Sequence, residues 1–380
     1  MSNDPSQDYF SDGITEDITT DLSRISSLFV IARNSAFTYK GKTVKVQDVS
    51  GEMGVRYVLE GSVRKSDNQV RITAQLVDAT TGYHLWSERY DRSLTDIFAV
   101  QDEIRQKIVT ALRVNLTREE RERFQRAPTD NLEAYDYYLR GGEYWLRSTK
   151  EANVQARQMF EKAIDLDPRF AGAYTMVGRT YWMEWVYQWS RDPETLDRAL
   201  TLAQSAITLD DALPGTHMLL ANVYQWKKQH EMAITEAEQA IALAPNYANA
   251  YADLGLVMTL AGRPQEALGA VEKAMRLDPR YPVYYLLFLG HAYRLLGQYE
   301  DAVATLKRAV VQNPHLLTVH TQLAATYSEW GMEKEAKAEA AEILRLNPSF
   351  SLEVFKQRIP YKDPTEVERY VAALRKAGLK

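Results

Sequence analysis

The chain has 380 residues, of which 45% are hydrophobic and 26% are charged, and its formal net charge is −5. This composition is typical of a soluble protein with room for two domains, and the acidic balance argues against a nucleic-acid partner. The absence of cysteine excludes disulfides, thiolate zinc sites and cysteine nucleophiles. No apolar run approaches the roughly 20 residues of a membrane helix, and no secretory leader opens the chain. We therefore expect a cytoplasmic protein that neither spans a membrane nor binds nucleic acid.

The first part of the chain alternates helical and strand-like segments. Asp12 is a suitable N-cap for a helix whose apolar residues share one face. A short buried strand is predicted at 28–32, and one or two helical turns at 47–53, ending at Gly54. The apolar residues of the first helix are Ile14, Ile18, Leu22 and Ile25.

Three strand-like runs follow, separated by turn residues at 66–68 and 80–82. In the middle run hydrophobic and polar residues alternate, which is typical of an antiparallel strand with one face in water. A helix is predicted at 97–116, because its hydrophobic residues recur at helical spacing. These elements predict a small α/β domain over residues 1–116, with a mixed sheet that contains an antiparallel meander. The three runs are 57–64, 70–77 and 83–90.

Beyond this domain the chain changes character. Residues 117–130 are densely charged and are interpreted as a helical tail and linker with a solvated face. From there on, chain-breaking residues recur at intervals of 43, 34, 34, 35 and 34 residues, and two helical patterns with a turn between them fit each interval. The breaking residues are Pro168, Asp211, Pro245, Pro279, Pro314 and Pro348.

The same residue types recur at fixed positions within these intervals. The triplet Leu220, Ala221 and Tyr224 returns as Leu254, Gly255 and Met258, and again as Leu289, Gly290 and Tyr293. A 34-residue helix–turn–helix period of this kind resembles the tetratricopeptide repeat. The resemblance implies six repeats over residues 131–350, stacked into an all-α solenoid. Gly255 is predicted to face Ala267, since small residues let two short helices approach closely.

The second repeat is nine residues longer than the 34-residue period. Its excess contains Trp182, Trp185 and Trp189, whose spacing predicts one extended helix face rich in tryptophan. Two interpretations are open. The rings pack on the neighbouring repeat, for example against Trp145, or they face a ligand, since aromatic anchors are favoured at interfaces.

Residues 351–380 are predicted to contain a helix that caps the solenoid. Asp363 and Pro364 form an N-cap and first-turn pair, and Gly378 ends the helix. A polar outer face is what the exposed end of a solenoid requires. The residues assigned to that face are Glu366, Glu368, Arg369, Arg375 and Lys376.

No catalytic constellation is found in the sequence. Residues 36–43 fit a permissive phosphate-loop pattern, but the bulky side chains from Phe37 to Lys40 argue against a loop whose amides point at a phosphate. The six histidines occur at no metal-ligand spacing, and no G-x-S-x-G nucleophile motif is present. We therefore expect no enzyme activity, no cofactor and no metal.

Several segments near the start of the chain carry a second resemblance. YFSDGITEDITTDLSRIS, LFVIARNSAFTYKGK, GVRYVLEGSVRK and VRITAQLVDATTGYHLWSERYDR closely resemble a TolB-amino-terminal-like domain. In bacteria this domain is joined to tetratricopeptide repeats in the C-terminal portion of class III adenylate and guanylate cyclases, and it also occurs in some winged-helix transcription regulators. The resemblance implies a regulatory, protein-binding half without the catalytic domain of those cyclases.

We therefore expect a non-enzymatic regulatory or scaffold module that binds a protein or peptide through the repeat groove. Two alternatives remain, a regulatory fragment of an adenylate or guanylate cyclase in cyclic-AMP signalling and the sensor half of a winged-helix transcription regulator. In such solenoids the first helix of each pair lines the concave face. Counted from the repeat starts, the groove candidates are Arg179, Trp182, Asn222, Gln225, Leu256, Tyr284, His291 and Arg294.

The resemblance also implies that the first domain lacks its first strand, because relatives place an apolar strand immediately before the stretch corresponding to residues 1–10. A missing strand would leave an open sheet edge, through which self-association is expected. Residues 1–115 would then be the labile part, exchanging amide hydrogens faster than residues 140–350.

Overall fold

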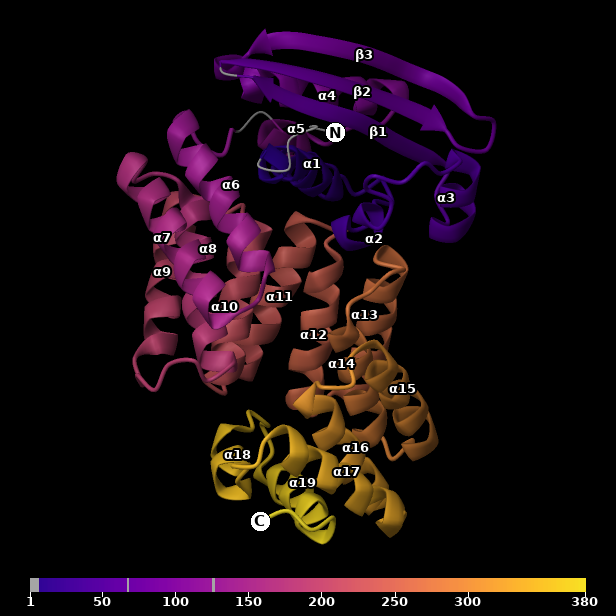
Figure 1. The fold of residues 1–380 in the computed structure, drawn as a ribbon, viewed down its shortest axis with the longest axis vertical. Coiled ribbons are helices and arrows are strands. Elements are labelled where there is room, and N and C mark those ends of the chain that lie inside the picture. Colours follow the sequence, from indigo (N-terminus) through magenta and orange to yellow (C-terminus); the bar gives the residue numbers. More distant parts are fainter. Residues whose placement is uncertain (1–6, 67, 125–126) are drawn as a thin grey trace. The chain divides into compact units, whose positions relative to one another are not determined.

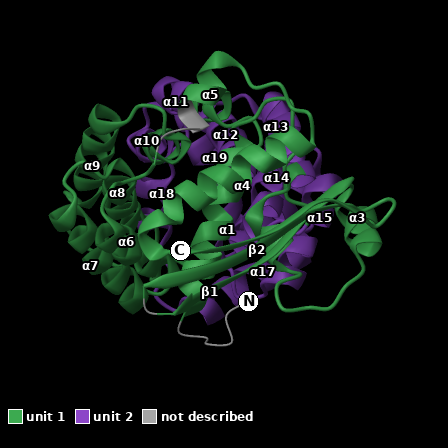
Figure 2. Ribbon diagram, turned by 90° about the horizontal axis from the view of Figure 1, so that it is seen from above, with its two compact units in different colours: residues 1–220, 239–247, 277–279 green, residues 221–238, 248–276, 280–380 purple. Residues whose placement is uncertain are grey.

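The computed structural model describes residues 7–66, 68–124 and 127–380 and divides into two compact units (Figure 2). Unit 1 consists of residues 1–220, 239–247 and 277–279, and unit 2 consists of residues 221–238, 248–276 and 280–380. Unit 1 therefore combines the α/β region with the first repeats, and the division between the two units falls within the repeats.

The N-terminal part of unit 1 contains short helices and one three-stranded sheet (Figure 1). Its elements in chain order are α1 (Asp8–Ser23), α2 (Arg33–Phe37), α3 (Val46–Met53), β1 (Tyr57–Ser66), β2 (Gln69–Asp78), β3 (Tyr83–Ser93), the 3₁₀ turn η2 (Leu94–Asp96), α4 (Ile97–Ala111) and α5 (Arg118–Phe124). The helical turns expected at 47–53 are confirmed, and Gly54 ends them with a φ of 67°.

The sheet is an antiparallel meander in the order β1-β2-β3, as the three strand-like runs predicted. Its solvated face carries cross-strand pairs, such as the hydroxyls of Ser62 and Thr73 at 2.7 Å. The β2–β3 turn contains Gly82 at a φ of 79°, which a residue with a side chain rarely adopts. Residue 67 of the other predicted turn lies outside the described residues. β1 and β3 are the edge strands of this sheet, and self-association through an edge stays a prediction.

Two expectations for the start of the chain are wrong. Asp12 lies inside α1 instead of capping it, because the helix begins four residues earlier at Asp8. Residues 28–32 form no strand, so the sheet is antiparallel throughout the described residues and is not mixed. Within that segment Phe29 is 47% exposed, which also contradicts burial.

The backbone of residues 28–32 is hydrogen bonded to the repeats instead of to the sheet. The amide of Ala32 donates to the carbonyl oxygen of Leu277 at 2.8 Å. The amide of Val30 donates to the side-chain oxygen of Asn246, whose Nδ2 in turn donates to the carbonyl of Ile25. Because these partners lie more than 200 residues away, a local pattern of apolar residues could not distinguish this segment from a strand.

The α/β region and the first repeats share one hydrophobic core. Helices α1 and α4 cover one face of the sheet, with Ile14 and Ile104 almost fully buried there. The predicted helix at 97–116 is confirmed in position but ends at Ala111. The same cluster continues into the first repeat through Tyr135, so α1 packs against both the sheet and the repeats.

Six helical hairpins follow, each made of two helices joined by a short turn or loop (Figure 1). Hairpin 1 is α6 (Leu132–Leu146) with α7 (Lys150–Leu166), hairpin 2 is α8 (Ala171–Val186) with α9 (Thr195–Leu209), hairpin 3 is α10 (Pro214–Trp226) with α11 (His230–Leu243), hairpin 4 is α12 (Ala248–Leu260) with α13 (Pro264–Leu277), hairpin 5 is α14 (Val283–Leu295) with α15 (Tyr299–Gln312), and hairpin 6 is α16 (Leu317–Trp330) with α17 (Glu333–Leu346). None of the helices among the described residues combines the length and apolarity needed to cross a membrane.

The longer second hairpin differs from the tryptophan-rich helix that we expected. Helix α8 ends at Val186, and Gln188 adopts a φ of 55° in the loop that follows. Trp189 therefore lies outside the helix, where its ring stacks on Tyr187 with 5.0 Å between centroids. The extra residues form a longer loop between α8 and α9, and α8 has 16 residues against 13 in α10 and α12.

The helices of hairpin 4 touch at Gly255, as the small residue there predicted. A methyl group added at Gly255 would lie 2.4 Å from Cγ2 of Val271 and 3.1 Å from the carbonyl oxygen of Ala267. We expect Gly255→Ala to lower the free energy of unfolding by about 1–3 kcal/mol, because the two helices must separate. The matched change Gly269→Ala, in the same hairpin, meets nothing within 4 Å. It should raise stability by up to about 1 kcal/mol, because alanine loses less backbone entropy on folding.

Urea unfolding followed by circular dichroism measures both changes. Effects of the same sign in the two variants would contradict the close contact at Gly255.

After hairpin 6 the chain forms α18 (Leu352–Arg358) and α19 (Pro364–Lys376). The predicted N-cap of α19 is confirmed, since the Asp363 carboxylate accepts a hydrogen bond from the amide of Thr365 at 2.8 Å. Gly378 follows the helix at a φ of 110°. The short helix α18 was not predicted.

Candidate functional site

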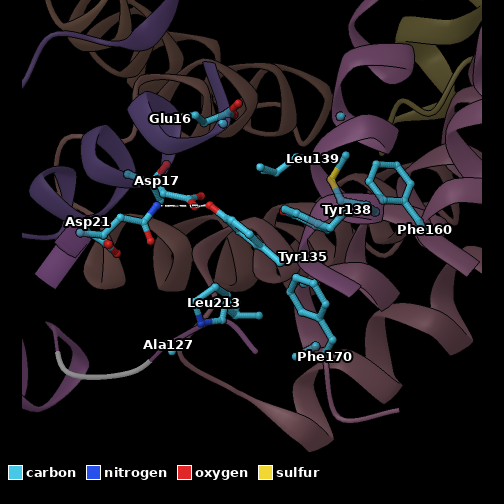
Figure 3. Close-up of a pocket in the computed structure, with 18 of the residues that line it drawn as sticks. Glu16, Asp17, Asp21, Ala127, Tyr135, Tyr138, Leu139, Phe160, Phe170 and Leu213 are labelled. Atoms are coloured by element: carbon cyan, nitrogen blue, oxygen red, sulfur yellow. Dashed lines mark hydrogen bonds between the residues drawn. The ribbon is translucent and has the colours of Figure 1, made fainter. Parts of the chain in front are cut away.

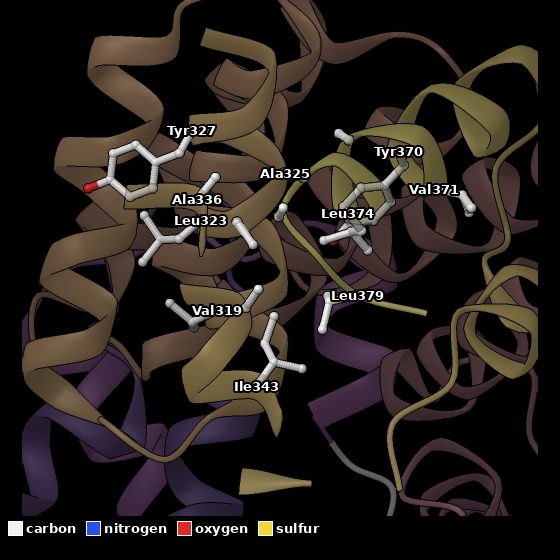
Figure 4. Close-up of a cluster of buried hydrophobic side chains, with 14 of the residues drawn as sticks. Val319, Leu323, Ala325, Tyr327, Ala336, Ile343, Tyr370, Val371, Leu374 and Leu379 are labelled. Carbon is white, nitrogen blue, oxygen red and sulfur yellow. The ribbon is translucent and has the colours of Figure 1, made fainter. Parts of the chain in front are cut away.

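The C-terminal segment, defined here as residues 359–380, is built into the core of unit 2. Tyr370, Val371 and Leu374 of α19 join Val319 and Leu323 of α16 in one buried cluster (Figure 4). Each of these side chains is at most 3% exposed. Because α16 is the first helix of its hairpin, the segment lies on the side of the repeats where we expected a groove.

Arg294 of α14 is the centre of the polar contacts with this segment, and its side chain is 0% exposed. Its Nη1 donates to Glu329 Oε1 at 2.7 Å, its Nη2 donates to the Tyr361 hydroxyl at 2.6 Å, and its Nε donates to Gln322 Oε1 at 3.2 Å. The guanidinium also lies 4.4 Å from the centre of the Tyr370 ring. The buried cation is therefore satisfied on every side, as burial of a charge requires.

The charge state of this cluster follows from its burial. Burial opposes the charge of Arg294, but Tyr361 and Glu329 outweigh it and hold the pKa of the guanidinium above its usual value. Burial raises the pKa of Tyr361 to about 12, although Arg294 acts in the opposite direction. At neutral pH a charged arginine therefore meets a neutral hydroxyl and a carboxylate.

His291, one turn before Arg294, fixes the orientation of the Tyr361 hydroxyl. Burial, reinforced by the nearby Arg294, lowers the pKa of His291 well below its usual value, so the ring is neutral. Its Nε2 is hydrogen bonded to the Tyr361 hydroxyl. The same oxygen accepts from Arg294, which can only donate. Tyr361 is thus bonded to both side chains at once.

Further contacts connect the C-terminal segment, and Arg358 just before it, to earlier helices of unit 2. The amide of Lys362 donates to the carbonyl oxygen of Leu260 at 2.9 Å, and its Nζ pairs with Glu231 at 2.6 Å. The guanidinium of Arg358 lies 5.6 Å from the centre of the Trp226 ring. We call the surface that receives these contacts the unit 2 groove, formed by Trp226, Glu231, Leu260, His291, Arg294, Gln322 and Glu329.

The structure places two predicted groove residues, Arg294 and His291, beneath Tyr361. The chain's own C-terminal segment covers both residues in this structure, and their contact with a partner stays a prediction. Arg369, assigned to the polar outer face of α19, is 37% exposed and also donates to Glu329 at 3.1 Å.

The other predicted residues of unit 2 lie on α10, α12 and α14 without forming one cluster. Asn222 donates to Asp253 at 3.3 Å, and Gln225 is buried. Leu256 packs against the hydrophobic cluster that includes α19. The Tyr284 hydroxyl donates to an asparagine of hairpin 4 at 2.9 Å.

Two predicted residues, Arg179 and Trp182, belong to α8 in unit 1. Arg179 donates to the carbonyl of Gly215 at 3.3 Å and to the Tyr247 hydroxyl at 3.2 Å, and its guanidinium lies 5.8 Å from the Trp145 ring. Trp182 is partly buried. Whether any predicted residue contacts a partner stays a prediction.

Sequence reasoning missed the residues that complete the Arg294 cluster, namely Tyr361, Glu329 and Gln322. Glu329 and Gln322 lie on α16 among ordinary repeat residues, and nothing in their spacing marks them. Tyr361 offered a signal, since it is an aromatic residue in a short segment between two prolines where a solvated linker would be polar.

Two stretches of the chain match models of a known repeat family. Residues 213–280 match a model described as tetratricopeptide repeat, and residues 290–331 match a model described as TPR repeat. The chain contains tetratricopeptide repeats. The matched TPR stretches fall on hairpins 3 to 6, and hairpins 1 and 2 have the same two-helix organisation.

The similar proteins include one enzyme by name and several TPR structures. The chain is 49% identical over 241 residues to the protein named putative adenylate cyclase 3 of Rhizobium meliloti, covering 63% of this chain and 40% of that protein. A thermophilic TPR protein of Thermus thermophilus is 19% identical, with a TM-score of 0.42 over 51% of this chain and 98% of its own. PilF of Pseudomonas aeruginosa is 18% identical, with a TM-score of 0.44, and the match covers 58% of this chain and 94% of PilF. The chain thus spans less than half the length of the Rhizobium relative.

Proposed function

We propose that the chain is a scaffold module without enzyme activity and that its unit 2 groove binds a segment of a partner protein. One observation carries this proposal. The groove already holds residues 359–380 as it would hold a bound peptide, through a tyrosine clamped by Arg294 and His291 and an amphipathic helix packed on α16. Helix-in-groove binding of this kind is a common mode of peptide recognition.

The contacts of the resident segment define the chemistry of the partner. Tyr361 supplies one hydroxyl that accepts from Arg294 and is also hydrogen bonded to His291, and phenylalanine can make neither bond. The helix that follows supplies an apolar face through Val371 and Leu374, and a cation through Arg369 for Glu329. We therefore expect a partner segment with a tyrosine a few residues before an amphipathic helix.

The resident segment competes with any such partner. A tethered segment acts at an effective concentration of about 1 mM when its linker is short. A free peptide of equal intrinsic affinity therefore binds the intact chain weakly. Loosening the resident segment should raise the apparent affinity for a free peptide without altering the groove.

A synthetic peptide of residues 359–380 tests this competition in trans. We expect Tyr361→Ala in the full chain to bind the labelled peptide at least about 10-fold more tightly than the unmodified chain does, because the resident segment loses its clamp. Fluorescence anisotropy measures the binding. The control Lys376→Ala changes a side chain that is 54% exposed and pairs only at 3.6 Å, and should behave like the unmodified chain.

Adding Arg294→Ala to the Tyr361→Ala variant should abolish peptide binding. Equal affinity of the unmodified chain and Tyr361→Ala, or binding that survives the loss of Arg294, would contradict the groove as the binding surface.

A second proposal concerns the pathway. We infer that the module is the regulatory region of a cyclase-type signalling protein, supported by the 49% identity to the Rhizobium relative and by the TolB-amino-terminal-like resemblance of the first 116 residues. Purified chain is then expected to form no cyclic AMP from ATP with Mg²⁺ or Mn²⁺. Cyclic AMP formation would assign catalysis to this chain itself.

A further inference from the structure

Unit 1 contains a cleft of about 540 Å³ that the proposed groove does not involve. Its walls come from α1, α4, α6, the start of α8 and the residues that lead into α10 (Figure 3). This volume lies within the range of about 300–1,000 Å³ that small-molecule sites occupy. All of its lining residues belong to unit 1, so it is independent of the unit 2 groove.

Asp17 of α1 lies in this cleft and differs from the other acidic residues around it. Its carboxylate accepts hydrogen bonds from the Tyr135 hydroxyl and from the amide of Gln101, both of which are neutral donors. Neighbouring carboxylates have cationic partners, since Arg105 pairs with Asp21 and Asp102. Glu16 likewise lies 3.5 Å from Arg33.

The charge balance at Asp17 therefore favours a cation from outside the chain. Burial raises the pKa of Asp17 to about 7, the bond from Tyr135 opposes this shift, and the negative charges of Asp21 and Glu16 add to it. A bound cation would offset each of the effects that disfavour the ionised carboxylate.

Aromatic rings form the wall beside Asp17. The Tyr135 ring, whose hydroxyl reaches Asp17, lies 4.9 Å from Phe98. The Tyr138 ring lies 4.8 Å from Phe170 (Figure 3). Aromatic faces attract cations and also bury apolar groups. A carboxylate at one end and rings along the side suit a ligand with one positive group and an apolar body.

We propose that this cleft binds a small organic cation, an ammonium or guanidinium group on an apolar or aromatic body, with its charge on Asp17 and its body against the partly buried ring of Tyr138. Asp17 and Tyr135 are the residues that recognise the charge. The tyrosine hydroxyl positions the carboxylate, and the rings exclude water from the ion pair.

Binding should strengthen with rising pH, because the ionised carboxylate is the form that attracts a cation. The charged and titratable groups that line the cleft with Asp17 come from several elements. They are Tyr9, Asp12, Glu16 and Asp21 on α1, Arg24 after it, Arg33 on α2, Asp102 and Arg105 on α4, Tyr135, Tyr138 and Glu143 on α6, Arg169 and Arg179 at α8, and Asp210. The described residues that line the cleft include no histidine. Burial raises the pKa values of both tyrosines, which stay neutral at this pH.

Calorimetric titration of the full chain with phenethylamine, agmatine and choline tests the proposal. At pH 8 we expect at least one of them to bind with a dissociation constant of about 1 mM or lower. Its affinity should fall about 30-fold at pH 5.5, where a carboxyl of pKa about 7 is mostly protonated. Asp17→Asn should lose this binding, whereas Glu143→Gln, a carboxyl on the rim paired with Arg147, should retain it.

Tyr135→Phe provides a second variant that keeps the ring and the carboxylate. Without the hydroxyl, the pH midpoint of binding should move upward. The proposal would be overturned if none of the three cations bound at a ligand concentration 10-fold above about 1 mM. Equal binding of the cation by Asp17→Asn and by the unmodified chain would overturn it too. So would equal binding of the neutral analogue 2-phenylethanol. Because the cleft lies in unit 1, none of these outcomes bears on the peptide groove of unit 2.

Discussion

Replacing Arg294 with alanine is expected to lower the free energy of unfolding of unit 2 by about 3 kcal/mol, at the lower end of the cost of breaking a buried charged cluster. The change leaves Gln322 and Tyr361 without their donor and opens a cavity beneath the Tyr370 ring. The loss stays at the lower end because Glu329 keeps Arg369 as a partner.

Urea unfolding followed by circular dichroism measures this loss. The matched control is Arg345→Ala, which removes an arginine bonded to Glu342 through two nitrogens, but on the surface, where the arginine is 59% exposed. An exposed pair of this kind contributes little, so the control should unfold like the unmodified chain. Similar stability of both variants would show that the Arg294 cluster does not hold the C-terminal segment.

Asp17→Asn is expected to stabilise the protein at pH 8 by about 3 kcal/mol and to have little effect near pH 4. The folded state raises the pKa of Asp17 to about 7, chiefly through burial, against an ordinary value of 3.8. A group with a raised pKa binds its proton more tightly in the folded state, so stability falls as pH rises from about 4 to about 7 and is level above. Asparagine carries no charge and avoids that loss, which is worth about 1.4 kcal/mol per pKa unit before solvent screening.

Thermal unfolding of the unmodified chain and of Asp17→Asn at a series of pH values measures the difference. Tyr135→Phe should act in the opposite direction, destabilising more at pH 8 than at pH 4, because the ionised carboxylate loses its strongest donor. A constant gap between Asp17→Asn and the unmodified chain from pH 4 to pH 8 would contradict the burial of this carboxyl.

The sequence predicted best the features that depend on local spacing. The alternation in residues 70–77 predicted β2, the 34-residue period predicted the helical hairpins, and Asp363 predicted the start of α19. The alternation and the cap involve residues close together in one element, and the period repeats along the chain, so each signal can be read without knowing the partner element.

The features that depend on distant partners were missed. Residues 28–32 read as a buried strand, but their hydrogen bonds go to Asn246 and Leu277, and no strand neighbour exists in the described sheet. Trp189 was placed on a helix because its spacing fits, although the chain leaves the helix after Val186. The first error arises because tertiary contacts override a short apolar pattern, and the second because the helix ends before Gln188, whose φ is 55°.

The same contrast between local patterns and distant contacts holds for the two candidate sites. The repeat positions placed Arg294 and His291 on the same helix face, and both side chains are bonded to Tyr361 in the structure. That the chain's own Tyr361 fills this surface, and that Asp17 meets Tyr135 in unit 1, depends on contacts across 67 to 118 residues. No pattern within one element carries such information.

Hydrogen–deuterium exchange of residues 359–380 in the full chain tests the central claim most directly, namely that this segment occupies the unit 2 groove. The amide of Lys362, bonded to the Leu260 carbonyl, and the amides of α19 should be protected in the unmodified chain. In Arg294→Ala the protection of this segment should fall, while that of unit 1 stays unchanged. Exchange of residues 359–380 in the unmodified chain as fast as in the free peptide would contradict the claim.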